Sequence, residues 1–309
     1  MNLLFKNIKT FKEVREDNTP EPTPIVANGI LLDNTLLTIV GSPKIGKTFL
    51  AYDLALAIAS GGHFLESEVI EPKSVLILSA EGGYFPNRKR IKKLTEEMND
   101  DVLENISYVP SVSLDLGQAE HLEAIVELIN KRGVQVMILD PFIRFHTTDE
   151  NSASSMSTIY SNIHKIMDET GVSVCLVHHT GKNQHAGARG SSVIASEYDS
   201  CITLTKTSTG VVKAVFDMRH VETPNPILLN FNSDTLRFDV TASDPQREER
   251  ISTAIEVLVK PMSKVQIVEQ LKKKGISKTP AYSVLAQMEK AGQIVSQDGK
   301  LVLSNTMMN

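Results

Sequence analysis

The sequence predicts an α/β fold with a parallel sheet that is extended by antiparallel strands and followed by a small winged-helix domain. Between residues 25 and about 240, short β-branched runs alternate with amphipathic stretches, which is typical of β–α–β units around a parallel sheet. After residue 199 the strand patterns follow one another without helical stretches, which indicates an antiparallel meander. Beyond residue 244, three helical patterns precede two short strands.

The first 24 residues are predicted to form an arm or linker. An amphipathic stretch is followed there by NTPEPTP, whose repeated prolines exclude both a helix and a sheet interior. The expected divisions of the chain are therefore 1–24 for the arm, 25–243 for the α/β domain and 244–309 for the winged helix.

Apolar runs mark the expected parallel strands at 36–40, 75–79, 134–139 and 172–177, with helices at about 47–59, 86–98, 117–131 and 152–170. Cys175 and Cys201 lie within apolar runs, so we expect both to be buried free thiols. In the C-terminal part we expect helices at 247–259, 264–274 and 278–291. Two strands flank Asp298 and Gly299, a pair that favours a tight hairpin turn.

The composition is that of a globular protein, with 309 residues of which 41% are hydrophobic and 22% charged. No apolar run reaches the roughly 18 residues of a membrane span, and the N-terminus lacks a signal-peptide pattern, so we expect a cytoplasmic protein without a membrane partner. The net charge of −5 is uneven: residues 247–309 carry +4, which leaves −9 elsewhere. This basic tail indicates either a nucleic-acid partner or a solvated lysine face.

A phosphate-binding motif follows the first strand and precedes a helical stretch. GSPKIGKT at 41–48 fits the pattern G-x-x-x-x-G-K-[ST] completely. In such a loop, backbone N–H groups and a helix N-terminus face the phosphates. Lys47 is expected to contact the β and γ phosphates, and Thr48 to coordinate Mg²⁺. The expected nucleotide-binding residues are Gly41, Ser42, Pro43, Lys44, Ile45, Gly46, Lys47, Thr48 and Phe49.

Two carboxylates end apolar strands at the edge where α/β sheets bind ligands. Asp140 ends VMILD and is expected to hold Mg²⁺ through water, the alternative being a surface aspartate after a strand. Glu81 follows the next strand pattern after the phosphate-binding loop and is the candidate general base for the water that attacks the γ phosphate. The position directly after such an aspartate often carries a glutamate that acts as the general base. Here that position is Pro141, which leaves Glu81 as the candidate.

A further strand ends in two histidines, His178 and His179. A polar residue at such a strand tip can contact the γ phosphate and transmit its loss to the next loop. Paired histidines also suggest a metal site, but adjacent strand residues point to opposite faces and no cysteine or carboxylate cluster accompanies them in the sequence.

Together these motifs resemble the RepA-type hexameric DNA helicases of broad-host-range plasmids, within the wider RecA, DnaB and KaiC-like group of P-loop ATPases. The resemblance covers residues 25–220. It rests on GSPKIGKT, on SAE ending at Glu81, on ILDPFIRFHTTDEN from Ile138 to Asn151, and on LVHHTGK followed by ARGSS. The winged helix lies outside it.

The resemblance implies a RecA-like fold and a role for each matched residue. Lys47 and Thr48 would bind ATP with Mg²⁺, Glu81 would be the catalytic base and Asp140 the magnesium carboxylate. His179 would sense the γ phosphate. The DNA-contacting residues would be Arg90 and a channel-lining loop that runs from Lys182 to Arg189 and needs positive charge more than base recognition.

One departure from the resemblance concerns the arginine finger, which acts on the site of a neighbouring subunit. The plasmid helicases place it eight residues after the first serine of RGSS, and that count from Ser191 reaches Asp199. Arg219 and Arg189 are the two alternatives.

The expected function is that of an ATP-dependent helicase or translocase that acts as a ring, in particular a hexamer, on single-stranded DNA during replication of a plasmid, phage or other mobile element. The winged helix would bind duplex DNA or a replication protein, although its third helix carries only Lys278 and Lys290 as basic residues. Two alternatives are a regulatory or recombination ATPase that binds DNA or a partner without unwinding, and a DNA-binding regulator whose assembly is controlled by nucleotide.

Overall fold

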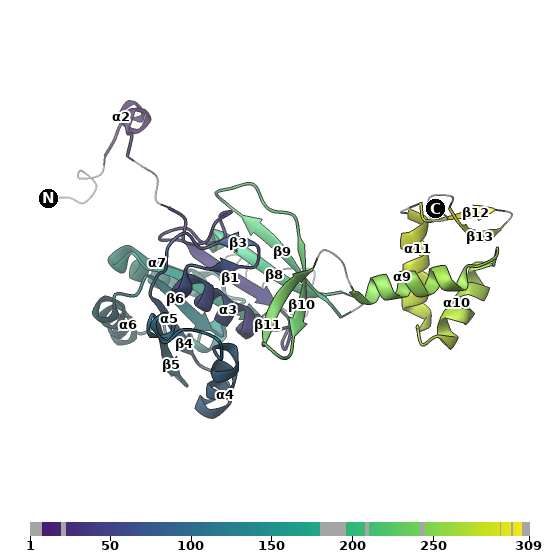
Figure 1. The fold of residues 1–309 in the computed structure, drawn as a ribbon. Coiled ribbons are helices and arrows are strands. Elements are labelled where there is room, and N and C mark those ends of the chain that lie inside the picture. The colour runs from purple at the N-terminus through teal and green to yellow at the C-terminus, as the bar shows by residue number, and fades with distance from the viewer. Residues whose placement is uncertain are drawn as a thin grey trace.

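A computed structural model describes residues 8–19, 23–179, 196–207, 210–241, 245–290, 292–297 and 299–304, with the side chains of 245–248 and 290 left out. Among these residues, nine strands form one large sheet (Figure 1). In chain order they are β1 (Leu36–Gly41), β4 (Val75–Ser79), β5 (Ile106–Pro110), β6 (Val136–Asp140), β7 (Ser173–His179), β8 (Ser200–Lys206), β9 (Val212–Met218), β10 (Ile227–Asn232) and β11 (Arg237–Thr241). Their order across the sheet is β11-β10-β9-β8-β1-β7-β6-β4-β5.

The sheet combines a parallel and an antiparallel part, as the sequence predicts. The strands from β8 across to β5 are parallel, whereas β9, β10 and β11 continue as an antiparallel meander. Strand β8 belongs to both parts, because it pairs in parallel with β1 and antiparallel with β9. The sequence pattern alone placed this strand in the meander, since its parallel partner lies far away along the chain.

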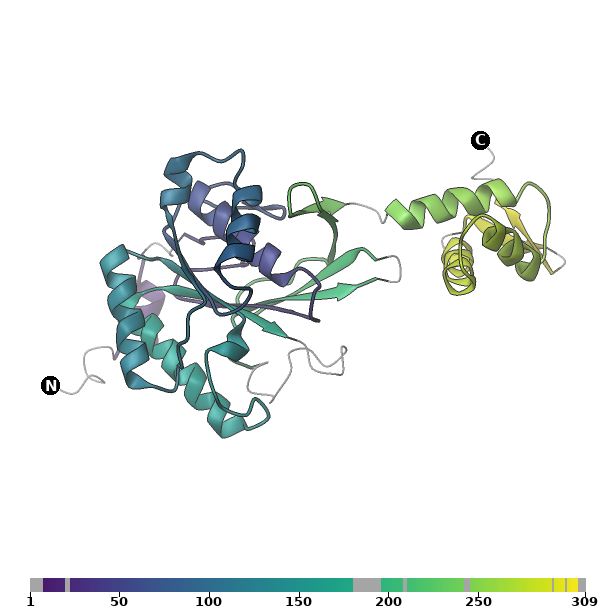
Figure 2. The ribbon, with the colours of Figure 1, turned by 90° about the horizontal axis from the view of Figure 1, so that it is seen from below.

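Helices cover both faces of the sheet (Figure 2). On one face α3 packs with the N-terminal part of the chain, and on the other α6 and α7 enclose a second apolar cluster. Alternate strand residues supply the two clusters: Leu37 and Ile39 belong to the first, and Leu36 to the second. The helices are α3 (Lys47–Ser60), α4 (Tyr84–Leu94), α5 (Asp100–Glu104), α6 (Ala119–Arg132), the 3₁₀ turn η1 (Phe142–Arg144) and α7 (Ala153–Thr170). Cys175 and Cys201 are free and buried in this core, as expected.

Edge strand β5 and several small elements were not predicted. Strand β5 pairs only with β4 among the described strands, and all its residues are half-buried. Its sequence, ISYVP, interrupts the apolar run with Ser107 and ends in proline, which a sheet edge tolerates. Helix α5 has only five residues, and β2 (His63–Phe64) pairs with β3 (Ser67–Glu68) as a two-residue hairpin.

The N-terminal arm contains the short helix α2 (Phe11–Glu16), which lies apart from the sheet in Figure 1. Thr10 and Glu13 form a capping box, so local hydrogen bonds specify the start of this helix. None of its residues is buried. Within the described part of the chain, no helix is long and apolar enough to cross a bilayer.

The C-terminal segment has the predicted order of three helices followed by two strands. Ser263 caps the second helix in a capping box with Gln266, and the last strand also pairs with Met262 before that helix. These elements share an apolar cluster of their own. They are α9 (Pro245–Val257), α10 (Lys264–Lys273), α11 (Lys278–Lys290), β12 (Ile294–Gln297) and β13 (Lys300–Leu303).

Candidate active site

The ends of four parallel strands meet at one edge of the sheet. Gly41 at the end of β1 pairs with His179 at the end of β7, and Ser79 at the end of β4 pairs with Asp140 at the end of β6. The carboxyl edge of a parallel sheet is where α/β proteins bind their ligands. The register therefore brings together segments that lie up to 138 positions apart in the sequence.

The loop after β1 is shaped by glycine. Gly46 has φ +105°, and no larger residue would fit there, because a Cβ at this position would come 2.5 Å from the ring of Phe238. Helix α3 begins directly afterwards at Lys47, with no side-chain cap on its N-terminus. Its first N–H groups thus point into the site, an arrangement that stabilises a bound anion.

The ammonium of Lys47 lies at the centre of the site and is almost fully buried. Its Nζ donates to the carbonyl oxygens of Gly41 at 2.8 Å and Ser42 at 2.9 Å, and lies 3.0 Å from Nδ1 of His179. Burial lowers the pKa of Lys47 to about 8, although the charges of Asp140 and Glu81 act in the opposite direction. At neutral pH this lysine is therefore still largely charged.

His179 faces this ammonium with a nitrogen that must accept. A charged ammonium has only donors, so Nδ1 of His179 carries the lone pair and Nε2 carries the hydrogen. Burial and the charge of Lys47 both lower the pKa of His179, which keeps the ring neutral at pH 7. The Nε2–H group is consequently a fixed donor at the tip of β7.

Thr48 and Asp140 supply the oxygen ligands that a magnesium ion requires. The carboxyl group of Asp140 is 5% exposed, and burial raises its pKa to about 6, while a hydrogen bond from Thr48 and the charge of Lys47 lower it. A hydroxyl next to a carboxylate that is mostly ionised at pH 7 fits a hard divalent cation. The loop after β1 offers N–H donors to the phosphates of a nucleotide, and a cation at Thr48 and Asp140 would lie beside them.

Glu81 lies just beyond β4 and its main chain is held firmly. The buried amide of Asn87 donates to the carbonyl oxygen of Glu81 at 2.9 Å, and Ser79 Oγ donates to the same oxygen at 3.3 Å. The carboxylate itself is half-exposed and accepts from Nε of Arg144 at 3.0 Å. Glu81 can therefore act as a base on a water molecule only in competition with this arginine.

An aromatic wall extends the site beyond the phosphate-binding loop. The rings of Phe49 and Phe231 lie 5.0 Å apart, those of Phe231 and Phe238 5.2 Å apart, and the guanidinium of Arg90 lies 5.6 Å from the ring of Phe49. Phe49, Phe231 and Arg90, together with the loop and the carboxylates, line a pocket of about 750 Å³. Flat rings beside a phosphate site are suited to stacking on a nucleobase.

The two histidines at the end of β7 turn to opposite faces, as strand geometry predicts. His178 is buried, and its Nδ1 donates to the carbonyl oxygen of His179 at 2.7 Å. Its Nε2 lies 3.0 Å from Oε1 of the buried Glu150, a contact that requires a proton on one of the two groups. Glu150 lies in a loop after β6, within the segment from Ile138 to Asn151 that carried the resemblance, but no sequence pattern pairs it with His178.

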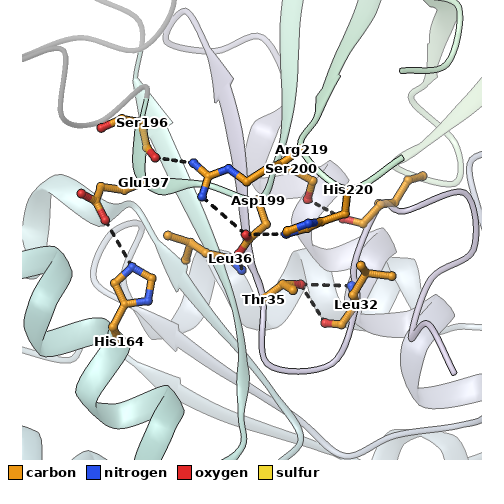
Figure 3. Close-up of polar contacts among 11 residues, drawn as sticks. Leu32, Thr35, Leu36, His164, Ser196, Glu197, Asp199, Ser200, Arg219 and His220 are labelled. Carbon is orange, nitrogen blue, oxygen red and sulfur yellow. Dashed lines mark hydrogen bonds and ion pairs between the residues drawn. The ribbon is translucent and has the colours of Figure 1, made fainter. Parts of the chain in front are cut away.

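Arg219 lies at the opposite, amino-terminal edge of the sheet, at the end of β9 (Figure 3). Its guanidinium donates to the carbonyl oxygen of Ser196 and lies 3.8 Å from Oδ1 of Asp199. The same Asp199 oxygen lies 2.9 Å from Nε2 of His220, and its other oxygen accepts from the N–H of Leu36. Asp199, which stands where the resemblance expects an arginine finger, thus anchors Arg219.

The remaining predicted residues fall into two groups. Arg90 lines the pocket, where its guanidinium also donates to Oδ1 of Asn87 at 3.1 Å. Its expected contact with DNA stays a prediction. Lys182 and Arg189 lie outside the described residues.

Sequence reasoning missed three contributors to this site: Arg144, Asn87 and Phe231. Arg144 belongs to the segment RFH that carried the resemblance, which was a usable signal. Asn87 and Phe231 lie in a helix and in the meander with no motif around them.

Comparison with known proteins agrees with this geometry. Residues 5–185, more than half of the chain, match the AAA domain family. Among solved structures, the crystal structure of the RadB recombinase is similar in fold, with a TM-score of 0.50 and 15% sequence identity over 68% of this chain and 92% of that one. The chain therefore belongs to the AAA domain family and is a P-loop ATPase of RecA-like fold.

Proposed function

We propose that the protein is an ATP-dependent helicase or translocase that acts as a ring on single-stranded DNA, in the replication of a plasmid, phage or other mobile element. The observation that carries the ATPase part is the convergence of Lys47, Thr48, Glu81, Asp140 and His179 at one edge of the sheet. The DNA part is supported by the sequence resemblance to RepA-type helicases. A cytoplasmic location accompanies this proposal.

In the proposed site, the residues at 41–49 hold the nucleotide and the chain's own groups carry the chemistry. The Glu81 carboxylate accepts a proton from the attacking water, and the Lys47 ammonium and the N–H of His179 stabilise negative charge on the phosphate oxygens. Thr48 and Asp140 hold Mg²⁺, which when bound neutralises charge on the β and γ phosphates. The wall of Phe49, Phe231 and Arg90 receives the base.

A ring is supported by the position of Arg219. Because it lies at the amino-terminal edge, it is remote from the phosphate site of its own chain, and as an arginine finger it serves only a neighbouring subunit. Its contact with Asp199 would hold it until the neighbour docks. Arg189 remains the alternative finger, and a hexamer the proposed assembly.

We propose domain limits of 25–243 for the ATPase and 244–309 for a winged helix. The order of three helices and a β-hairpin, the bridge between Met262 and Leu301, and a separate apolar cluster support this division. The basic tail favours duplex DNA as its ligand, whereas the few basic residues of α11 favour a replication protein. The arm of residues 1–24 stands outside both domains.

The rival proposal is a RecA-like regulatory or recombination ATPase that binds DNA or a partner without unwinding. The similarity to a structure described as the RadB recombinase supports it. Both proposals share the ATP site, so only the consequence of hydrolysis separates them.

One set of assays decides between them. ATPase rates with and without single-stranded DNA are compared for the parent, Lys47→Ala and Glu81→Gln. We expect DNA to stimulate the parent, Lys47→Ala to bind nucleotide poorly, and Glu81→Gln to bind it but turn over little. Displacement of a strand from a forked substrate supports the helicase; stimulation without displacement supports the recombination-type ATPase, and no stimulation contradicts both DNA-dependent functions.

A further inference from the structure

Helix α4 carries an exposed stripe of aromatic and basic side chains directly beside the active site. It consists of Tyr84, Phe85, Arg88, Lys89 and Lys92, and we call it the α4 stripe. Tyr84 is 50% and Phe85 68% exposed, which is unusual for rings of this size. At about 100° per residue, these five positions fall within one arc of the helix. The stripe is therefore a continuous surface.

The opposite face of α4 fixes the helix to the protein. Asn87, Ile91 and Leu94 lie there, and the two apolar residues pack on the core shared with α3. Lys93, between the two faces, donates to the carbonyl oxygen of Ser233 at 2.9 Å. The helix thus presents its aromatic side to solvent while its buried side accounts for its stability, so the exposed rings are not needed for packing.

The chemistry of the stripe suits a single-stranded nucleic acid. The guanidinium of Arg88 lies 5.0 Å from the ring of Phe85 and 5.7 Å from that of Tyr84, and the two rings lie 5.4 Å apart. Helix α4 contains five Lys and Arg residues and no acidic residue, although the whole chain has a net charge of −5. Stacking rings with adjacent cations bind exposed bases and phosphates together. A duplex hides the base faces that such rings need.

The stripe is also connected to the catalytic carboxylate. Only Gly82 and Gly83, both with positive φ, separate Glu81 from the start of α4. Asn87, on the buried side of the helix, donates to the carbonyl oxygen of Glu81 at 2.9 Å. A ligand that fixes α4 therefore also fixes the main chain that carries the general base.

We infer that the α4 stripe binds single-stranded DNA, with bases stacked on Tyr84 and Phe85 and phosphates held by Arg88, Lys89 and Lys92. The inference rests on the proposed function, since it assumes that single-stranded DNA is a ligand. It goes beyond that function by assigning the contact to a surface next to Glu81.

The first test measures how much the rings of Tyr84 and Phe85 contribute to the binding of single-stranded DNA. Binding of a fluorescein-labelled dT20 strand is followed by anisotropy for the full-length parent and for Tyr84→Ala/Phe85→Ala. We expect the affinity to fall about tenfold for each ring removed. Phe11→Ala is the matched control, because Phe11 is 95% exposed on the arm, and its affinity should equal that of the parent. Thermal melting and nucleotide binding of the double variant should be unchanged, since both rings are exposed.

A strand of the same length with abasic sites separates stacking from charge. The parent should bind the abasic strand more weakly than it binds dT20. On the abasic strand, the double variant should bind almost as well as the parent, because there are no bases left to stack. An equal loss on both strands would overturn stacking. Lys89→Gln/Lys92→Gln should reduce the slope of log K against log salt by about 1.4. Lys131→Gln/Lys165→Gln, on exposed positions of α6 and α7, is the control and should keep the slope of the parent. An unaltered slope for Lys89→Gln/Lys92→Gln contradicts the inference.

The remaining outcomes distinguish the inference from the proposed function. If the parent does not bind dT20, the proposed function fails and the inference with it. If the parent binds and the double variant binds equally well, only the inference fails. Light scattering provides the last readout: should Tyr84→Ala/Phe85→Ala dissociate the assembly, the stripe is a contact between subunits and the DNA inference is overturned.

Discussion

The ammonium of Lys47 lies 3.0 Å from Nδ1 of His179, so the lysine of the phosphate loop directly contacts the residue at the tip of β7. The same ammonium also donates to two carbonyl oxygens of its own loop. A γ phosphate attracts Lys47 more strongly than neutral acceptors do. Binding of the γ phosphate would therefore break the contact between Lys47 and His179 and alter the position of the histidine. Loss of the phosphate would restore that contact.

This relationship predicts the behaviour of His179→Ala. The variant keeps the loop, Lys47 and the magnesium ligands, so its Kd for ATP should remain within about threefold of the parent. Its kcat should fall by about 10²-fold, because one fixed donor to the phosphate oxygens is lost. Steady-state kinetics with equilibrium binding of a nucleotide analogue measure both. A loss of binding with unchanged kcat would show that His179 only shapes the pocket.

Asp140→Asn should stabilise the protein while abolishing its activity. Burial raises the pKa of Asp140 from 3.8 to about 6, so this group stabilises the fold below about pH 4 and that contribution is lost as the pH rises through 6. At pH 7.5 the neutral amide should raise the free energy of unfolding by at most about 3 kcal/mol. Urea titrations between pH 4 and 8 measure it. Equal stability of the two proteins at pH 7.5 would mean that the carboxylate is not strained by burial.

Arg144→Ala should raise the ATPase rate measured without DNA. The arginine donates to Glu81 at 3.0 Å and so occupies a carboxylate oxygen that would otherwise accept from the attacking water. Exposed ion pairs of this kind contribute about 0.2–1 kcal/mol, so the expected increase is at most about fivefold. Glu81→Gln/Arg144→Ala should remain inactive. A lower rate in Arg144→Ala, restored by Arg144→Lys, would instead show that the arginine orients the base.

Phe231→Ala should weaken nucleotide binding through the base alone. The ring lies 5.0 Å from Phe49 in the pocket wall, where we propose that the base stacks. The KM for ATP should rise about tenfold with little change in kcat, since stacking is equal in the ground and transition states. Inorganic tripolyphosphate should inhibit the variant and the parent equally. A parallel loss of tripolyphosphate binding would place the ring in the phosphate site.

The sequence predicts the parts of this protein that local patterns encode. The fold class, the phosphate loop and the strands that end in Gly41, Asp140 and His179 follow from apolar runs and from one motif. Because the strands are parallel, these ends meet at one edge of the sheet. The strand pattern predicts this meeting but not the distances between the side chains. The roles of Glu81, Asp140 and His179 remain predictions, although the geometry favours them.

What the sequence does not predict depends on contacts between distant segments. Arg144 and Glu81 are 63 positions apart, and Phe231 reaches Phe49 only because β10 folds back along the meander. Edge strand β5 was missed because half-burial leaves no continuous apolar run. The sequence of α4 is that of an ordinary basic helix. Only the structure shows that Ile91 and Leu94 pack on the core and that the rings of the α4 stripe face outward.

Strand β1 is bonded to β7 on one side and to β8 on the other. Its six residues span about 20 Å, and because it is hydrogen-bonded on both sides it forms a rigid connection between the two edges of the sheet. One end carries the loop that would bind the phosphates. At the other end the N–H of Leu36 donates to the Asp199 carboxylate that anchors Arg219. In a closed ring, a small displacement at the phosphate end of β1 would be transmitted along the strand to Arg219 and so to the next subunit. ATP hydrolysis would then proceed from one subunit to the next around the ring.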